Sequence, residues 1–284
     1  MTGTLFVVAT PIGNLEDLTF RALRVLREAD LIAAEDTRRT SKLLAHYEIR
    51  KSMISLHEHN EHREAPRLVE RIQAGATVAL VTDAGTPGIS DPGAKLVAAA
   101  REAGVHVVAV PGPSAVTAAL SVTGLETSTF LFLGFPPPSG AARSKWMERL
   151  KAEPGPVVFF EAPHRIRRTI ADLTGVVERP IFVHRELTKI HETYVLRPKT
   201  ANIPEKGEFV VVVGSRVTRG ISAETQMDPA VIFRFAACLV GLGVVDANDV
   251  PRLVGKAFDL DERAVPKLLK KGRYLVNQQT NAEP

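Results

Sequence analysis

Five short apolar runs alternate with helical patterns over the first 122 residues, and this alternation limits the possible folds most strongly. The runs span residues 5–9, 31–34, 53–56, 78–81 and 105–110. After each run come a polar or Gly/Pro-rich loop and a helical pattern, the last expected at 115–122. Strands that alternate with helices usually form one parallel sheet with helices on both faces. We therefore predict an α/β fold with a mostly parallel five-stranded sheet.

The loop at residues 82–93 is the most unusual of these connections. It contains three glycines and two prolines, and it follows an apolar run typical of a strand buried on both faces. Glycine lets backbone approach a ligand closely, and α/β proteins bind small molecules at the carboxyl ends of parallel strands. Four other polar or Pro-rich loops follow strands at the same edge: 10–14, 35–39, 57–60 and 111–114. We expect this edge to form one wall of an active site.

A second unit is predicted to begin near residue 127. Its expected strands lie at 130–135, 157–160, 181–183 and 209–213, with a long connection at 193–205. The shorter repeats predict a smaller, mixed sheet, and the chain after about residue 220 has the pattern of a helical extension. The predicted domains are therefore residues 1–126, 127–219 and 220–284.

Positive charge is concentrated in the middle of the chain. Residues 141–220 contain 15 Lys and Arg against 9 Asp and Glu, a net charge of +6, whereas the whole chain carries +4. Such a segment can face phosphate groups, or it can simply be a solvated surface. Charge alone leaves both readings open.

Several common chemistries lack their sequence signatures. The first strand is not followed by G-x-G-x-x-G, and no P-loop or H-E-x-x-H motif occurs, so we predict no metal site. The single cysteine, Cys238, excludes a disulfide within the chain. No apolar run reaches about 18 residues, and the first residues lead straight into a strand. We expect no membrane association and a cytoplasmic protein.

Seven loop motifs, taken together, resemble one enzyme family. The motifs are 10–15 (TPIGNL), 34–38 (AEDTR), 56–60 (LHEHN), 83–87 (DAGTP), 111–115 (PGPSA), 161–165 (EAPHR) and 185–189 (RELTK). In this order they resemble the small-subunit ribosomal RNA (cytidine-2′-O)-methyltransferases, which are tetrapyrrole-methylase-like (class III) S-adenosylmethionine enzymes. The resemblance extends over about residues 4–215.

The resemblance implies two α/β domains with S-adenosylmethionine in the cleft between them, usually in a homodimer. It also implies which residues bind the cofactor: Pro11, Asp83, Gly85, Thr86, Ser114, Ala115, Phe160 and Leu187. The RNA, naked or within the small subunit, would lie over the basic second domain and the segment at 37–39. The arginines proposed to bind it are Arg38, Arg39, Arg165, Arg168 and Arg185.

The reaction itself indicates a need for a base. A ribose 2′-hydroxyl is a poor nucleophile, so a carboxylate within hydrogen-bond reach would assist it. The carboxylates at the predicted strand ends are Glu35, Asp36, Asp83, Asp91 and Glu161. We favour Glu161 or Glu35 as the catalytic carboxylate, with Lys189 or Arg185 as its charge partner. The alternative for Arg185, Glu186 and Lys189 is a structural ion-pair network.

Two other functions remain open from the sequence. The same fold could methylate a small molecule such as a tetrapyrrole, although the basic middle segment argues against this. A non-catalytic protein that binds RNA or the ribosome could also keep the fold, although the intact loops at the strand ends argue against it.

Overall fold

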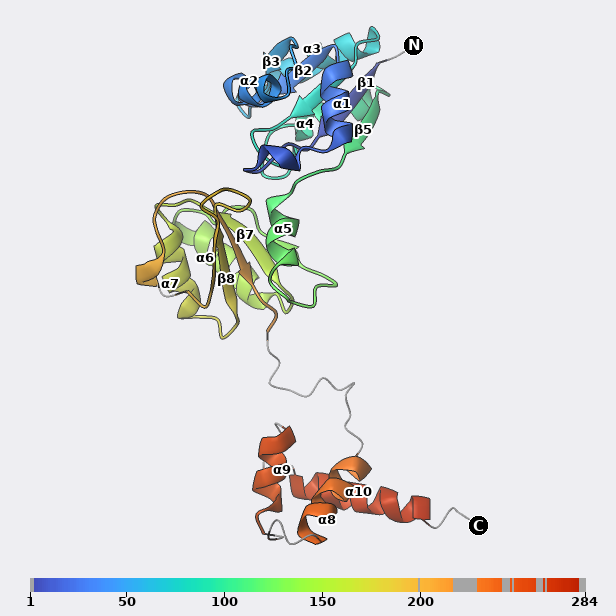
Figure 1. Ribbon diagram of the computed structural model, residues 1–284, viewed down its shortest axis with the longest axis vertical. Helices are drawn as coiled ribbons and strands as arrows, with labels where there is room; N and C mark the ends of the chain where they lie inside the picture. Colours follow the sequence, from blue (N-terminus) through green and yellow to red (C-terminus); the bar gives the residue numbers. More distant parts are fainter. Residues whose placement is uncertain are drawn as a thin grey trace. The chain divides into compact units, whose positions relative to one another are not determined.

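The computed structural model describes residues 3–198, 200–216, 229–241, 246, 248–258, 263 and 265–280. The chain forms two compact units, Met1–Arg216 and Val217–Pro284. The first unit contains both sheets and the second is helical (Figure 1).

The first sheet is parallel throughout, as predicted. Its strands are β1 (Thr4–Val8), β2 (Leu31–Ala34), β3 (Met53–Ser55), β4 (Val78–Val81) and β5 (His106–Val110). Their order is β3-β2-β4-β1-β5, so β4 lies in the centre, and all four of its residues are buried. The carboxyl ends of all five strands therefore meet at one edge, which carries the unusual loops.

Two helical layers cover this sheet because side chains alternate along each strand. In β4, Val78 and Leu80 pack with α3 (Glu61–Gln73) and α4 (Ala94–Glu102). Ala79 and Val81 pack on the other side with α1 (Phe20–Glu28) and α2 (Thr37–His46). A short 3-10 turn, η1 (Leu15–Asp17), precedes α1.

The helix α5 (Ala115–Ser121) follows β5 in the chain but packs on the second sheet. Figure 1 shows α5 beside this sheet. Its buried Val116, Ala119 and Leu120 join a cluster with side chains of the strands β7, β8 and β10. Helical spacing predicted the helix correctly, but it could not show which sheet the apolar face would cover.

The second sheet is mixed, also as predicted. Its strands are β6 (Leu131–Phe132), β7 (Val157–Glu161), β8 (Ile181–Arg185), β9 (Thr193–Leu196) and β10 (Phe209–Val213), in the order β6-β7-β10-β8-β9. Only β6 and β7 pair in parallel. Opposite α5, α6 (Gly140–Ala152) and α7 (Ile166–Thr174) cover the sheet, and η2 (Thr200–Asn202) contacts α7.

Two expectations for this sheet were wrong. Residues 193–196, expected within a long connection, form the edge strand β9, where Tyr194 is paired with His184. The strand is only four residues long and all four are exposed, so no buried apolar pattern marks it. The strand expected at 130–135 is limited to Leu131–Phe132.

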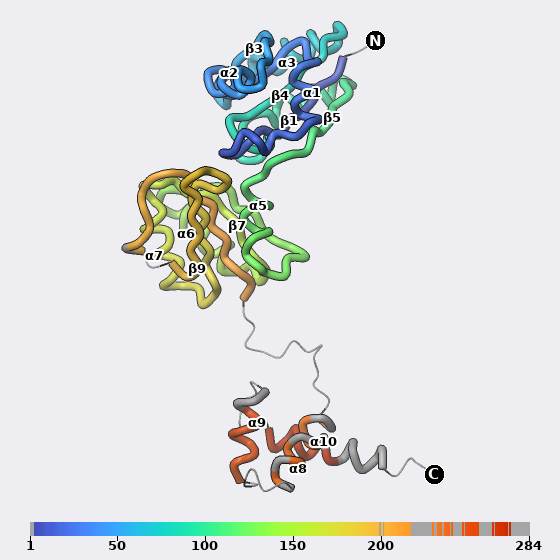
Figure 2. The backbone as a smooth tube through the Cα atoms, viewed as in Figure 1, coloured from blue at the N-terminus to red at the C-terminus, as the bar shows by residue number. Residues whose placement is uncertain are grey.

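The unit Val217–Pro284 contains α8 (Pro229–Gly241), α9 (Val250–Phe258) and α10 (Val265–Thr280), in agreement with the predicted helical extension. Its described core consists of Ile232, Ala236, Val250, Val254 and Val265. Cys238 of α8 is exposed. Figure 2 traces the backbone as a tube coloured from the N-terminus to the C-terminus. Among the described residues, no helix is long and apolar enough to cross a membrane.

The core of the second sheet yields a stability prediction. Phe159 is fully buried and packs edge to face on Trp146, with ring centroids 5.0 Å apart. Phe159→Ala should lower the free energy of unfolding by about 3–5 kcal/mol, because it leaves a cavity in a close-packed core. Phe20→Ala is the control, since Phe20 is 94% exposed, and it should change stability by less than about 0.5 kcal/mol. Denaturant unfolding measures both, and equal effects would contradict this assignment of the core.

Candidate active site

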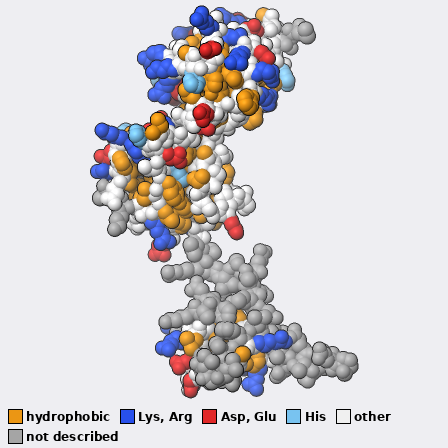
Figure 3. Space-filling view, in the orientation of Figure 1, with side chains coloured by type: hydrophobic (Ala, Val, Ile, Leu, Met, Phe, Trp, Pro, Cys, Tyr) orange, Lys and Arg blue, Asp and Glu red, His pale blue; other side chains and the backbone are white. Residues whose placement is uncertain are grey.

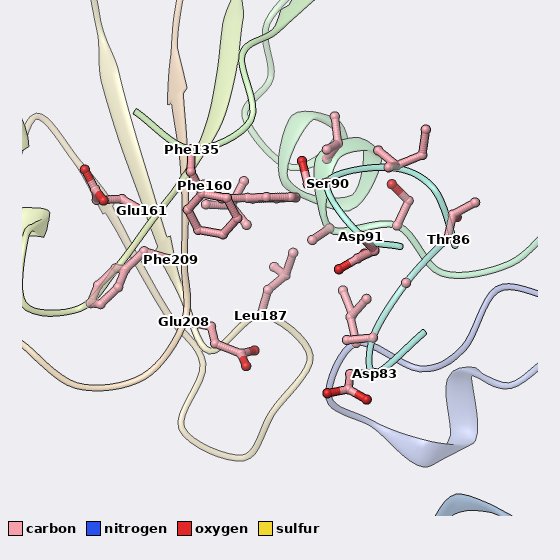
Figure 4. A pocket seen from close by; sticks show the side chains of 18 of the residues that line it. Asp83, Thr86, Ser90, Asp91, Phe135, Phe160, Glu161, Leu187, Glu208 and Phe209 are labelled. Carbon is pink, nitrogen blue, oxygen red and sulfur yellow. The ribbon is translucent and has the colours of Figure 1, made fainter. Parts of the chain in front are cut away.

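A cavity of about 530 Å³ lies between the carboxyl edge of the first sheet and the adjacent face of the second sheet. Loops from both sheets line it, and Figure 4 shows part of this lining. The lining residues are Ile12, Glu35, Arg39, Asp83, Ala84, Gly85, Thr86, Ile89, Ser90, Asp91, Ser114, Ala115, Val116, Phe135, Phe160, Glu161, Ala162, Pro163, Leu187, Gly207, Glu208, Phe209 and Val210. Its volume is typical of a small-molecule binding site.

Backbone pairing holds the first wall together. Thr10 N–H donates to the Gly85 carbonyl at 2.9 Å, and Gly85 N–H donates to the Thr10 carbonyl at 3.0 Å. The Thr10 hydroxyl also donates to the carbonyl of Thr82 at 3.0 Å. The loop after β1 is thereby fixed against the loop after β4, and Ile12 reaches the cavity.

Carboxylates at the ends of β2 and β4 form the polar part of this wall. Glu35 Oε2 accepts hydrogen bonds from the Thr82 hydroxyl at 2.6 Å and from Asp83 N–H at 3.2 Å. Asp83 Oδ1 in turn accepts a hydrogen bond from Asp36 N–H, and Asp83 Oδ2 lies 3.4 Å from Arg39 Nε. Burial, followed by the negative charge of Glu35, raises the pKa of Asp83 despite the nearby Arg39.

The second wall is largely apolar. Phe160 packs against Phe132 and Phe135, with ring centroids 5.1 Å and 5.5 Å apart. Leu187 enters the cavity from the loop after β8, opposite the Asp83–Thr86 loop (Figure 4). The residues on either side of it, Glu186 and Thr188, have φ values of +54° and +68°. Such backbone is costly for residues other than glycine and is often found at functional sites.

The two walls are in direct contact beside the cavity. Asn14 N–H donates to Thr188 Oγ1 at 3.1 Å. A Cβ atom on Gly13 would lie 2.5 Å from Lys189 Cγ and 2.8 Å from Thr188 Oγ1, so only glycine allows this approach. The loop after β1 and the loop after β8 are therefore packed directly against each other.

Comparisons with known proteins agree with this geometry. Residues 4–204 match the model for Tetrapyrrole (Corrin/Porphyrin) Methylases. The chain is 47% identical over 220 residues to "Ribosomal RNA small subunit methyltransferase I" of Synechocystis, covering 74% of this chain and 78% of the relative. The protein of the same name from Xylella fastidiosa is 49% identical, covering 74% and 81%.

The chain belongs to the tetrapyrrole methylase family. It is an S-adenosylmethionine-dependent methyltransferase, as the loop motifs predicted.

Solved structures of tetrapyrrole methylases and related enzymes share this fold. A diphthine synthase matches with a TM-score of 0.60 and 18% identity, covering 75% of this chain and 90% of its own. A uroporphyrin-III C-methyltransferase from Thermus thermophilus, complexed with S-adenosylhomocysteine, matches with a TM-score of 0.54 and 18% identity. That match covers 76% of this chain and 99% of the other. The two-sheet arrangement is therefore the common tetrapyrrole methylase fold.

Of the predicted cofactor-binding residues, seven line the cavity: Asp83, Gly85, Thr86, Ser114, Ala115, Phe160 and Leu187. Pro11 is buried, and its neighbour Ile12 is the residue that lines the cavity. Ser114 occupies the N-cap position of α5. Its side chain makes no capping hydrogen bond to α5, and it faces the cavity instead.

Glu161 is held in a buried network rather than directed into the cavity. Its Oε1 accepts from Ala162 N–H at 2.7 Å and lies 2.8 Å from the guanidinium of Arg165. Its Oε2 accepts from the Thr169 hydroxyl at 2.5 Å, and Arg143 donates to the same hydroxyl. In Figure 4 its carboxylate points away from Asp83 and Asp91. Both oxygens therefore serve to organise the loop between β7 and α7.

Lys189 forms an ion-pair network, the alternative left open by the sequence. Its Nζ lies 3.0 Å from Glu186 Oε1 and 2.8 Å from Glu208 Oε2. Glu186 Oε1 also accepts from Glu208 N–H at 2.8 Å. This network fixes the loop that carries Leu187, and Lys189 itself does not line the cavity.

The predicted RNA-binding arginines differ in their surroundings. Arg39 lines the cavity, and Arg38 is 87% exposed while paired through two nitrogens with Asp36. Arg168 is exposed on α7. In contrast, Arg165 binds Glu161, and Arg185 donates from Nε to the Lys206 carbonyl at 2.7 Å.

Sequence reasoning missed part of the apolar wall. Phe135 and Ile89 line the cavity although they are 53% and 51% exposed. Ile89 lies within the Gly/Pro-rich loop at 82–93, and Phe135 directly precedes the prolines at 136–138. An apolar residue in or next to such a loop is the signal that could have indicated them. Glu208 was missed because it precedes the last strand rather than following one.

The environment of Glu161 yields a prediction that separates a structural from a catalytic role. Glu161→Gln should lower the free energy of unfolding by about 3 kcal/mol, because it breaks a buried charge pair with Arg165. The matched control is Glu148→Gln on α6, which removes an exposed pair with Lys151 and should cost less than about 1 kcal/mol. Thermal or denaturant unfolding measures both. Unchanged stability of Glu161→Gln together with lost activity would instead make Glu161 catalytic.

Proposed function

We propose that the protein transfers the methyl group of S-adenosylmethionine to the ribose 2′-hydroxyl of a cytidine in small-subunit ribosomal RNA. The observation that carries this proposal is the sequence identity of 44–52% to relatives named ribosomal RNA small subunit methyltransferase I. The seven loop motifs that motivated the same function lie within or beside the matched region. Such a substrate is cytoplasmic, and so is the proposed location of the protein.

The residues around the cavity fit the proposed cofactor. Phe160, Leu187 and Ile12 offer apolar surface for a nucleobase, while Asp83 offers a carboxylate that can accept from hydroxyl or ammonium groups. When bound, S-adenosylmethionine supplies a methyl group that its positively charged sulfur has already activated. The protein's residues then mainly need to bind and orient the two reactants and keep water out.

The proposed RNA-binding surface begins at the mouth of the cavity. Arg39 lines the cavity, Arg38 is beside it in the sequence, and Arg168 is exposed on the second sheet's helical layer. Lys and Arg side chains occur over both sheets' layers on the face seen in Figure 3. Arg165 and Arg185 already bind protein groups, so they would contribute to RNA binding indirectly, by holding their loops in place. Phosphate contacts of this kind position an RNA without reading its sequence.

The proposed homodimer has a suitable surface on the second sheet. The edge strand β9 exposes Tyr194, Val195 and Leu196 by 42–48%, and Ile190 just before it is 98% exposed. An exposed apolar edge strand is normally covered by a partner. A second copy of the chain would cover this strip.

Methyl transfer to small ribosomal subunits that lack the modification tests the proposed function. Labelled S-adenosylmethionine is supplied, and the RNA is digested to nucleosides. We expect label on the ribose of a cytidine. Label on a base, or on a tetrapyrrole instead of RNA, would contradict the proposed substrate. Cofactor binding without any methyl transfer to RNA would contradict the proposed substrate, but it would still agree with a methyltransferase.

Asp83→Ala tests the proposed cofactor site. It should weaken binding of S-adenosylhomocysteine at least tenfold, because a carboxylate within the cavity wall is lost. Glu102→Ala, on the exposed end of α4, is the control and should bind normally. Isothermal titration measures both, and circular dichroism checks the fold. If Asp83→Ala binds S-adenosylhomocysteine as tightly as the wild type, Asp83 does not contact the cofactor.

A further inference from the structure

The loop before α4 adds a third carboxylate to the first wall of the cavity, after Glu35 and Asp83. Asp91 lines the cavity together with its neighbours Ile89 and Ser90, and Figure 4 shows Asp91 and Ser90 in the lining. Ser90 has φ of +64°, a left-handed conformation that is costly for a serine and persists only where surrounding structure enforces it. Gly93 has φ of +126°, and a Cβ there would lie 2.8 Å from Leu80 Cδ2. The loop is therefore tightly constrained around Asp91.

Glu61 supplies much of this constraint from the neighbouring helix α3. Its side chain is buried, and its Oε1 accepts hydrogen bonds from the backbone N–H groups of Gly93, Lys95 and Leu96 at 2.9, 2.8 and 3.2 Å. Glu61 immediately follows the His57–Asn60 motif, which the proposed cofactor site does not use. The same motif is anchored to β3, because Asn60 Nδ2 donates to the Ser55 carbonyl and its Oδ1 accepts from His57 N–H. Asn60 is the N-cap residue of α3, but its side chain makes these bonds and no capping hydrogen bond to the helix.

The other carboxylates around the cavity are engaged elsewhere. Glu161 uses both oxygens in a buried network, and Glu208 is paired with Lys189. Glu35 Oε2 accepts two hydrogen bonds from the β4 loop. Asp83 is tied to Asp36 N–H and to Arg39. Asp91 lines the cavity from a loop that Glu61 of α3 holds in place.

We propose that Asp91 is the proton acceptor for the reacting hydroxyl and that Glu61 is its positioning residue. This inference rests on the proposed function. The 2′-oxygen forms a bond to the methyl carbon, and the carbon–sulfur bond breaks with its electron pair left on sulfur. The hydroxyl proton passes to an Asp91 oxygen and is later released to water.

The electrostatic surroundings of Asp91 suit this role. Burial, followed by the negative charge of Glu35, raises the pKa of Asp91 to about 7; the nearby Thr82 hydroxyl lowers it, and the negative charge of Asp83 raises it further. Arg39 is the nearby cation, and it is paired with Asp83. A base with a pKa near the working pH is the most effective proton acceptor. The cationic methyl donor, once bound, would favour the deprotonated, negatively charged form of Asp91 and so lower its pKa.

The test is the pH profile of methyl transfer to small ribosomal subunits by the full-length protein. For the wild type, kcat/KM for the methyl donor should rise with pH, with a midpoint near neutral, because Asp91 must be deprotonated. The midpoint in kcat should lie lower, since bound donor favours the charged form. Asp91→Asn should lower kcat about 10²- to 10⁴-fold, abolish the rising limb, and bind S-adenosylhomocysteine within about threefold of the wild type.

The Glu61 variants test positioning separately. Glu61→Gln keeps an acceptor oxygen and should retain more activity than Glu61→Ala, with the rising limb present in both. Glu70→Gln, on the exposed side of the same helix, should match the wild type. A loss of the limb in Glu61→Ala, or equal activity in all three variants, would overturn the role of Glu61.

The outcomes separate this inference from the proposed function. Wild-type protein that methylates no RNA overturns both. Wild-type activity with an Asp91→Asn variant that keeps its rate or its rising limb overturns the role of Asp91 alone. Asp91→Asn that folds but loses S-adenosylhomocysteine binding also overturns it, because Asp91 would then be a cofactor ligand.

Discussion

The contact between the loop after β1 and the loop after β8 determines the site. Gly13 approaches Lys189 and Thr188 so closely that no side chain fits between them, and Asn14 N–H bonds the Thr188 hydroxyl. The contact brings Leu187 opposite the Asp83–Thr86 loop and so closes a cavity between two sheets. The ion pairs of Lys189 stabilise the β8 loop, and the pairing of Thr10 with Gly85 stabilises the β1 loop.

The two walls have opposite chemical character. Parallel strands bring all their carboxyl ends to one edge, and the loops at this edge carry Glu35, Asp83 and Asp91. The mixed sheet contributes apolar side chains such as Phe160 and Leu187 instead. Carboxylates in so sheltered a place lose hydration and repel one another, which raises the pKa of Asp83 and Asp91. A cationic ligand with a nucleoside part complements both walls, since it offers positive charge to one and a flat apolar ring to the other.

Much of this could be predicted from the sequence, because local patterns determine it. The alternation of strands and helices predicted the parallel sheet, and loops rich in glycine and proline marked the edge that lines the cavity. Long-range packing was harder to foresee. Nothing local shows that α5 covers the second sheet, that exposed residues 193–196 form a strand, or that Glu161 turns into a buried network with Thr169 and Arg165. Each depends on partners distant in the sequence.

The central claim is that the cavity between the two sheets holds the methyl donor. A crystal structure of the full chain grown with S-adenosylhomocysteine tests it most directly. The account predicts density for the ligand between the Asp83–Thr86 loop and the side chains of Phe160 and Leu187. Density for the ligand at any other place, with this cavity filled only by solvent, would contradict the account.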